Sequence, residues 1–301
     1  MEWISFLPKI ALTIALLLLL IVVGLSFLLV WSNVHPPRYP LRTSPASYGV
    51  PFEEVSFSAQ DGMQLKGWYL PARGGKEEKG PAVIICHGLG ASKSDFAELG
   101  AYLSQRGFQA LLFDWRAHGE SGGKACSFGY RERLDLLAAM DLIEKKEGVD
   151  PRRIGVYGFS LGGAVAIMTA AECQKIRAIV ADSAFSSMDE EATHVLTQIY
   201  HYPRFPFLTA GKLIFRLLLG VGLEDISPMS AIGKLSPRPI LLIAGVGDET
   251  IPDTHAGYLY EAAGHPKELW LIQGATHGGT LAAAGSEYQE RVERFFSQAL
   301  R

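Results

Sequence analysis

An uninterrupted apolar run lies near the N-terminus. From Ile10 to Val30 no side chain is charged, and most residues are Leu, Ile, Val, Ala or Phe. A helix of this length covers about 30 Å, which is the thickness of the hydrocarbon core of a bilayer. Trp3 and Trp31 flank the run, where membrane proteins place interfacial aromatic residues. The pattern predicts a membrane-spanning helix, and we assign residues 1–32 to an N-terminal anchor.

A cleaved signal peptide is the alternative interpretation of this run. The apolar part of a signal peptide is about 7–15 residues long and ends at a cleavage site with small residues. The run here is longer and ends in Phe27-Leu28-Leu29-Val30-Trp31, which favours a retained single-pass anchor. Lys9 lies on one side of it, and Arg38 and Arg42 lie on the other, so the distribution of positive charge selects neither membrane face for the rest of the chain.

The segment that follows the anchor is rich in proline. Residues 33–51 contain Pro36, Pro37, Pro40, Pro45 and Pro51. Such a segment favours extended backbone, so we expect a tether that holds the remaining chain near the membrane.

Short apolar runs alternate with amphipathic stretches over residues 52–301. Asp61-Gly62 separates the first two runs, as in a hairpin, and helical patterns separate most of the others. This alternation predicts one α/β domain with a mainly parallel central sheet flanked by helices, whose functional loops follow the carboxyl ends of the strands. The predicted strands are 55–59, 64–70, 82–86, 110–114, 153–158, 176–182, 239–244 and 268–272. The predicted helices are 92–106, 131–146, 161–173, 254–263 and 285–300.

Residues 183–236 interrupt the alternation and form a predicted cap insertion. The interval is too long for one crossover and is rich in apolar and aromatic residues. Residues 201–207 contain two prolines and predict a poor helix, whereas residues 213–219 predict a short and very apolar one. The cap either covers an apolar pocket or faces the membrane, or it completes the core.

Charge and cysteine content exclude some classes of function. The chain has 28 basic and 31 acidic residues, a net charge of -3 and no basic block, so we expect no nucleic-acid partner. Cys86, Cys126 and Cys173 lack the spacing of a zinc or redox site, and we interpret them as structural thiols.

A candidate nucleophile lies between a strand and a helix. Gly158-Phe159-Ser160-Leu161-Gly162 follows the predicted strand 153–158 and opens an apolar helical stretch. A nucleophilic serine has to stand on a sharp turn, and glycines two residues before and after it allow neighbouring backbone to approach. The motif predicts Ser160 as the nucleophile of an acyl-transfer reaction.

A serine hydroxyl needs a base, and the base needs a carboxylate. His277 follows the last predicted strand, and we favour it over the other histidines as the general base. Asp248 follows the strand 239–244, which gives the order Ser160, Asp248, His277. Asp182 also ends a strand and is the rival carboxylate, with hydrogen bonding between loops as its alternative role.

The tetrahedral intermediate of such a reaction needs two hydrogen-bond donors for its oxyanion. The backbone N–H of Leu161 opens a helix and is one candidate, and the N–H of Leu89 in His87-Gly88-Leu89-Gly90 is the other. We expect His87 itself to brace this loop.

These motifs together resemble the α/β-hydrolase superfamily over nearly all of residues 52–301, and in particular membrane-anchored serine hydrolases of the serine-aminopeptidase-like type. The resemblance is carried by His87-Gly88, the run 114–121 (DWRAHGES), the GxSxG motif, Gly247-Asp248 with Ile251-Pro252, and His277-Gly278. Ala117 stands where the family commonly has glycine. The resemblance implies hydrolysis of esters, thioesters or amides.

We therefore expect a membrane-anchored serine hydrolase that cleaves carboxylic esters, with a small-molecule, acyl or lipid-like ester as substrate. The triad requires no metal and no organic cofactor. A peptidase or amidase, an acyltransferase using the same triad, and a non-catalytic scaffold with this fold are the alternatives.

Overall fold

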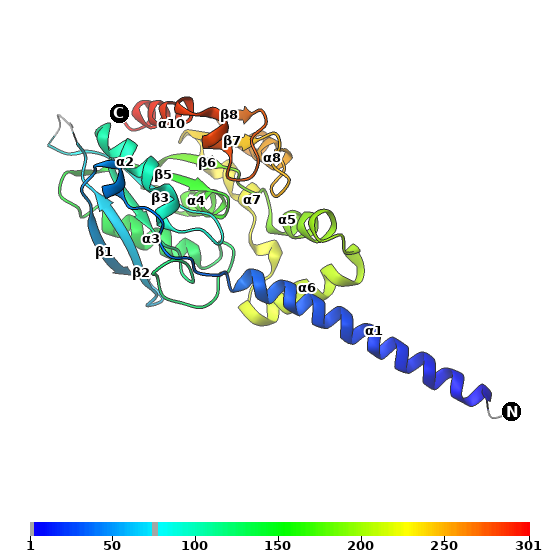
Figure 1. The fold of residues 1–301 in the computed structure, drawn as a ribbon. Helices are drawn as coiled ribbons and strands as arrows, with labels where there is room; N and C mark the ends of the chain where they lie inside the picture. Colours follow the sequence, from blue (N-terminus) through cyan, green and yellow to red (C-terminus); the bar gives the residue numbers. More distant parts are fainter. Residues whose placement is uncertain (1–2, 74–77) are drawn as a thin grey trace.

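The computed structural model describes residues 3–73 and 78–301, and its centre is one eight-stranded sheet (Figure 1). The strand order is β1-β2-β4-β3-β5-β6-β7-β8. β1 and β2 form an antiparallel hairpin, β2 is antiparallel to β4, and all other neighbours are parallel. The predicted mainly parallel sheet is confirmed. The bounds are β1 Glu53–Ser58, β2 Gln64–Leu70, β3 Gly80–Cys86, β4 Gln109–Phe113, β5 Val149–Phe159, β6 Ile176–Asp182, β7 Ile240–Gly245 and β8 Lys267–Ile272.

Helices cover both faces of the sheet, and the central strands are therefore apolar on both sides. Ile84 and Cys86 of β3 pack with α3 (Glu132–Ile143) and α4 (Leu161–Glu172), whereas Val83 and Ile85 pack on the opposite face. The opposite face is covered by α2 (Ala97–Gln105) and α10 (Ser286–Ala299). The other helical elements of the body are α8 (Thr254–Ala262), α9 (Thr280–Ala284), η1 (Pro45–Tyr48), η2 (Lys93–Phe96) and η5 (Gly233–Leu235).

A helical insertion lies between β6 and β7. It contains α5 (Met188–His194), the π-helical turn η3 (Val195–Ile199), α6 (Arg204–Leu219), η4 (Leu223–Asp225) and α7 (Pro228–Ile232). The prediction of a poor helix over 201–207 agrees with the structure up to Phe205 and is wrong for Pro206 and Phe207, because Pro206 lies in the first turn of the regular helix, where proline is tolerated. Phe205 keeps non-helical dihedral angles (φ −101°, ψ 133°), and regular helix begins after it.

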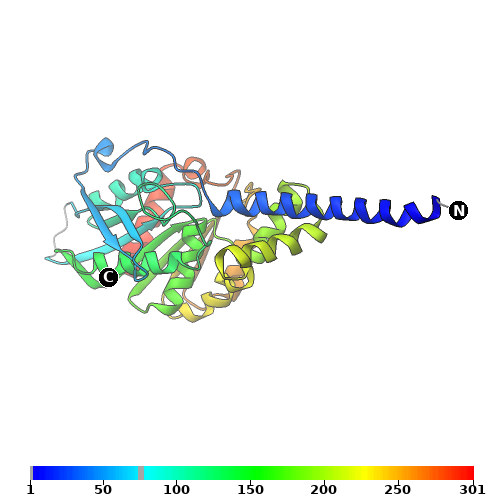
Figure 2. The same ribbon diagram turned by 90° about the horizontal axis from the view of Figure 1, so that it is seen from below.

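α1 (Trp3–Val34) projects from the body (Figure 2). Residues 6–21 are exposed, and burial begins at Val22, where α1 reaches α6. Its length and apolar composition are those of a membrane-spanning helix and also those of a signal sequence. Its exposure distinguishes it from the core helix of a soluble protein.

The proline-rich segment lies against the body after α1 ends. The guanidinium of Arg38 donates to the carbonyls of Gly119, Ser121 and Gly123 at 2.9, 2.5 and 2.7 Å. The backbone N–H of Arg42 donates to the Ser94 hydroxyl at 3.0 Å. These bonds fix the direction in which α1 leaves the body.

Candidate active site

Ser160 stands on a sharp turn between β5 and α4. Its backbone has φ 53° and ψ −116°, a conformation that L-residues rarely adopt. The two glycines of the motif are needed for close contact: a Cβ on Gly158 would lie 2.3 Å from the carbonyl oxygen of Gly162, and a Cβ on Gly162 would lie 2.3 Å from that of Cys86. The Ser160 N–H donates to the Asp182 carbonyl at 2.7 Å. This packing holds the serine in its strained turn.

His277 and Asp248 follow adjacent strands, β8 and β7, and their side chains meet. Nδ1 of His277 lies 2.7 Å from Oδ2 of Asp248. The other carboxylate oxygen, Oδ1, accepts from the N–H groups of Thr250 and Ile251 at 2.9 and 2.8 Å. Because Asp248 is an acceptor, the imidazole carries its proton on Nδ1 and keeps a lone pair on Nε2. A ring in this tautomer can accept a proton from a hydroxyl.

One cavity of about 400 Å³ brings the candidate residues together. Ser160, Leu161, His277 and Leu89 all line it. In the described part of the chain no direct hydrogen bond joins the Ser160 hydroxyl to His277, and catalytic hydrogen bonds of this kind often tighten only when substrate binds. Within residues 3–73 and 78–301, no group of three or more His, Cys, Asp or Glu side chains could hold a metal ion.

The loop after β3 lies directly against Ser160. A Cβ on Gly88 would be 3.2 Å from Cβ of Ser160 and 2.9 Å from the Phe159 ring, so only glycine allows this approach. The loop therefore places Leu89 beside the serine in the cavity wall, and the Leu161 N–H is the first of α4 and has no partner within that helix.

His87 braces this loop as a neutral ring. Burial, together with the neighbouring His118, lowers the pKa of His87 to about 3. Its Nδ1–H donates to the Gly88 carbonyl at 2.7 Å, and its Nε2 accepts the Trp115 N–H at 3.2 Å. Both ring nitrogens are thus used to hold the loop.

Asp182, the rival carboxylate, ties helices α9 and α10 to the end of β6. Oδ2 accepts from the hydroxyls of Thr280 in α9 and Tyr288 in α10 at 2.7 and 2.5 Å, and Oδ1 accepts from Ser183 at 3.0 Å. Burial raises the pKa of Asp182 even though these three donors oppose the shift. Thr280 opens α9 directly after the loop that carries His277, so Asp182 supports the position of the histidine without bonding to it.

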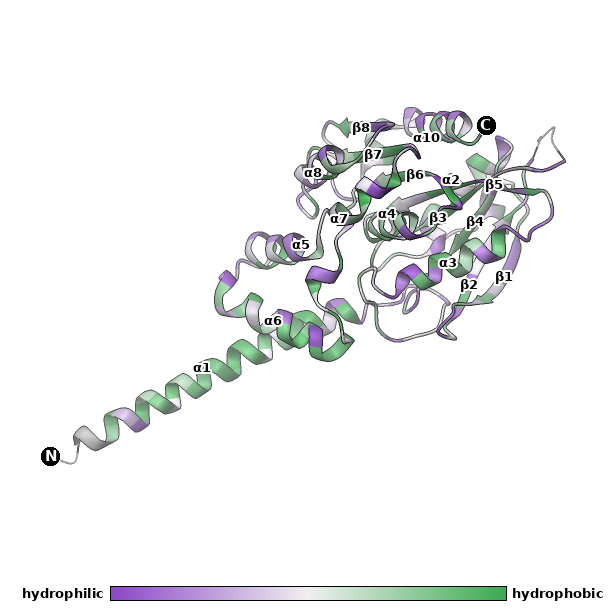
Figure 3. Ribbon diagram, turned by 180° about the vertical axis from the view of Figure 1, so that it is seen from behind, coloured by the Kyte–Doolittle hydropathy of each residue, from purple (hydrophilic) through white to green (hydrophobic). Residues whose placement is uncertain are grey.

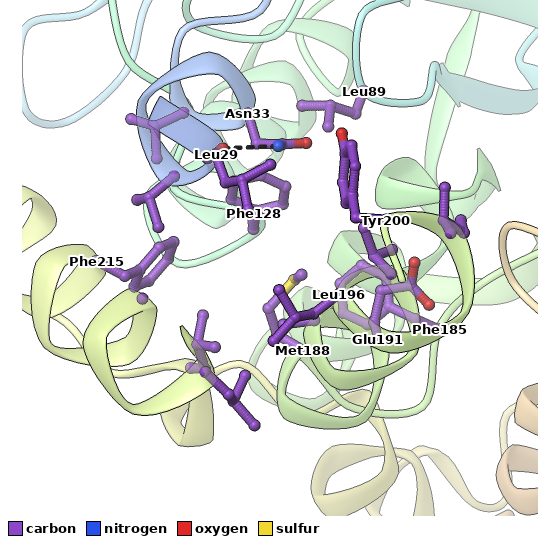
Figure 4. Close-up of a pocket in the computed structure, with 18 of the residues that line it drawn as sticks. Leu29, Asn33, Leu89, Phe128, Phe185, Met188, Glu191, Leu196, Tyr200 and Phe215 are labelled. Carbon is purple, nitrogen blue, oxygen red and sulfur yellow. Dashed lines mark hydrogen bonds between the residues drawn. The ribbon is translucent and has the colours of Figure 1, made fainter. Parts of the chain in front are cut away.

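The rest of the cavity wall comes from elements that sequence reasoning did not assign to the site. Figure 4 shows Met188, Leu196 and Phe215 of the insertion facing Leu29 and Asn33 of α1. The Asn33 amide donates to the Leu29 carbonyl at 2.8 Å. Ser26 and Asn33 are two polar residues seven positions apart on one side of an apolar helix, and this spacing is a sign of a buried face that the sequence analysis did not use.

Glu191 was also missed, and it is a carboxyl group in this largely apolar cavity. The residue is 6% exposed, and burial, together with the charge of Asp248, raises its pKa to about 8. Oε2 has no hydrogen-bond partner among the described residues, and Nε2 of His255 lies 3.6 Å from it. Since burial also lowers the pKa of His255, this contact joins two neutral groups at pH 7.

Comparisons with known proteins agree with this architecture. The family model described as the alpha/beta hydrolase fold matches residues 81–209. The uncharacterized protein YfhR of Escherichia coli O157:H7 is 31% identical over 252 residues, which cover 82% of this chain and 81% of that protein. An uncharacterized Mycobacterium tuberculosis protein, Rv2307c, is 33% identical over 247 residues, covering 81% and 79% of the two chains.

A solved structure extends the similarity to three dimensions. The Pyrococcus furiosus esterase Pf2001 superposes with a TM-score of 0.72 and 27% identity, covering 90% of this chain and 99% of that one. The structural similarity and the sequence matches lead to the same conclusion. The chain belongs to the α/β-hydrolase superfamily.

Proposed function

We propose that this hydrolase is a membrane-anchored serine esterase that cleaves carboxylic esters of acyl or lipid-like substrates. The observation that carries the proposal is the shared cavity, in which the strained Ser160 and the Asp248-bonded imidazole of His277 lie beneath apolar side chains. The similarity to an esterase supports the ester as the bond that is cleaved. Residues 1–32 serve as the anchor, 33–51 as the connection, and 52–301 as the catalytic domain with its cap at about 183–236.

The mechanism follows from the residues around the cavity. Nε2 of His277 accepts the Ser160 proton as Oγ attacks the ester carbonyl, and Asp248 stabilises the imidazolium that forms. The N–H groups of Leu89 and Leu161 donate to the oxyanion. The imidazolium then protonates the departing alcohol, which leaves an acyl group on Ser160. Water, deprotonated by His277, releases the acid and restores the serine.

Fluorophosphonate labelling tests the proposal. Wild-type protein should react covalently, because the probe requires an activated serine, whereas Ser160→Ala should not be labelled. Intact-protein mass spectrometry gives the readout, and thermal unfolding shows that the variant is folded. An unlabelled wild type would instead favour a non-catalytic scaffold. If wild-type protein reacts with the probe and, in a separate assay without probe, cleaves peptide amides and ignores long-chain esters, the peptidase alternative replaces the esterase.

A further inference from the structure

The last turns of α1 pack against the first turns of α6. The Ser26 hydroxyl donates to the Phe207 carbonyl at 3.4 Å, and a Cβ on Gly211 would lie 3.8 Å from a methyl of Val30. These contacts bring the two helices to van der Waals distance. Figure 3 shows both helices as predominantly hydrophobic and side by side, away from the sheet.

The length of α1 determines how deep this contact lies if α1 is a membrane anchor. The uncharged run begins at Ile10, directly after Lys9, and its exposed residues 10–21 cover about 18 Å. The hydrocarbon core is about 30 Å thick, so roughly two more turns have to enter it. Those turns are about residues 22–29, which include the Ser26 contact with α6. The membrane surface then passes through α6 near its contact with Val30.

The outward face of α6 suits this position. Leu213 and Leu217 lie four residues apart on one side of α6 and are 59% and 76% exposed, and Phe205, directly before the regular helix, is 79% exposed. The helix contains no acidic residue and carries Arg204, Lys212 and Arg216. An exposed apolar stripe combined with basic residues is typical of helices that lie in the membrane interface.

We propose that the beginning of α6 inserts into the same bilayer leaflet as the end of α1, and that the cavity between them receives long-chain acyl esters directly from that leaflet. Ser26 and Val30 of α1 and Phe207 of α6 line the cavity, and Ser160 lines it too. Tyr200, also part of the lining, is 43% exposed, as expected for an aromatic residue at headgroup level. The substrate class rests on the proposed esterase activity, whereas the membrane position of α6 rests only on α1 being the proposed anchor.

A depth measurement tests the membrane position without any catalysis. The full chain, with the half-buried Cys173 replaced by serine, is labelled with a fluorophore at Phe205→Cys or, as control, at Tyr258→Cys on α8. Tyr258 is likewise exposed, at 51%. In phosphatidylcholine vesicles with brominated acyl chains, the label at position 205 should lose about half of its fluorescence and the label at 258 should lose none. Equal quenching at the two positions overturns the proposal.

Hydrolysis by the reconstituted full chain tests delivery from the leaflet. Phe205→Asp should lower turnover of a long-chain p-nitrophenyl ester held in vesicles about tenfold, because a charged residue opposes insertion of the helix end. Phe205 does not line the cavity, so turnover of soluble p-nitrophenyl acetate should stay within about twofold. Tyr258→Asp should spare both activities. A parallel loss on both esters, or no loss on either, contradicts the proposal. A wild type that cleaves neither ester but shows quenching at 205 overturns the esterase function alone.

Discussion

Two carboxylates near His277 differ in their hydrogen-bond partners, and this difference separates their roles. Asp248 accepts from the imidazole and from two backbone N–H groups, whereas Asp182 accepts from three hydroxyls. A hydroxyl can donate to the amide oxygen of asparagine as well as to a carboxylate, so Asp182 should tolerate replacement by asparagine. Asp248 has to accept from an imidazole N–H and should tolerate the same replacement less well.

Asp248→Asn should therefore lower kcat about 10³- to 10⁴-fold, because the amide NH₂ would face Nδ1 and select the tautomer with its proton on Nε2. Asp182→Asn should lower kcat by less than about tenfold, since the amide oxygen can still accept from Thr280 and Tyr288. Steady-state hydrolysis of p-nitrophenyl esters measures both. A larger loss for Asp182→Asn would assign the catalytic carboxylate to Asp182.

Glu191 gives the protein a pH-dependent stability. Its pKa is about 8 in the folded protein, whereas the ordinary pKa of a glutamate is 4.5. The folded state therefore binds the Glu191 proton more tightly than the unfolded state does. The protonated carboxyl group contributes its full stabilisation of the fold below about pH 4.5, and this contribution is lost as pH rises through about 8.

Glu191→Gln removes this titration while keeping the size of the side chain. Between pH 5 and pH 9 the free energy of unfolding of wild type should fall by roughly 4 kcal/mol more than that of the variant. Chemical denaturation in detergent at several pH values measures the difference, and other titrating groups cancel in the comparison. Parallel pH profiles for the two proteins would show that Glu191 ionises normally.

The residues chosen from the sequence lie around one cavity because each follows a strand of the same parallel sheet. Ser160, Asp248 and His277 follow β5, β7 and β8, and the Leu89 loop follows β3. The order of motifs was enough to place them at one edge of the sheet. Glu191 could not be found in this way, because its burial depends on side chains of the insertion and of the loop after β7.

At the scale of elements, the start of α4 is fixed by its contact with the end of β3. The Cβ of alanine at position 162 would lie 2.3 Å from a backbone carbonyl oxygen, which cannot move without distorting the sheet. Gly162→Ala should destabilise the protein by at least about 3 kcal/mol. Gly257→Ala in α8 is the matched control: nothing lies within 4 Å of its Cβ, and it should stabilise by up to about 1 kcal/mol. Denaturant unfolding compares them, and equal effects would refute the contact argument.

The bounds of helices and strands with a clear periodicity were predicted within a few residues. The insertion was predicted as a cap, but the bounds of its helices were not. The predicted strand 176–182 coincides with β6, and the predicted helix 161–173 ends one residue beyond α4. α5 was not predicted, and α6 is longer than the predicted 213–219. The insertion packs its apolar residues toward both the cavity and α1, so the one-sided pattern that identifies a surface helix is absent from it.

At the scale of the whole molecule, a sheet domain and a projecting helix meet at the candidate active site. The anchor was predicted as a segment connected by a tether, and no pattern in the sequence indicated that its last turns form a wall of the cavity. In the structure, Arg38 holds the segment after α1 against the body through hydrogen bonds, and α1 itself packs against α6 of the insertion.

The sequence by itself determined the order of strands and helices, the apolar N-terminal helix and the identity of the candidate catalytic residues, because these depend on local periodicity and on motifs at strand ends. Only the tertiary structure decided what surrounds Ser160: the helices of the insertion, the end of α1, and a buried carboxyl group with a raised pKa. Those features arise from contacts between segments far apart in the chain, such as Ser26 with Phe207, and local patterning does not encode such pairings.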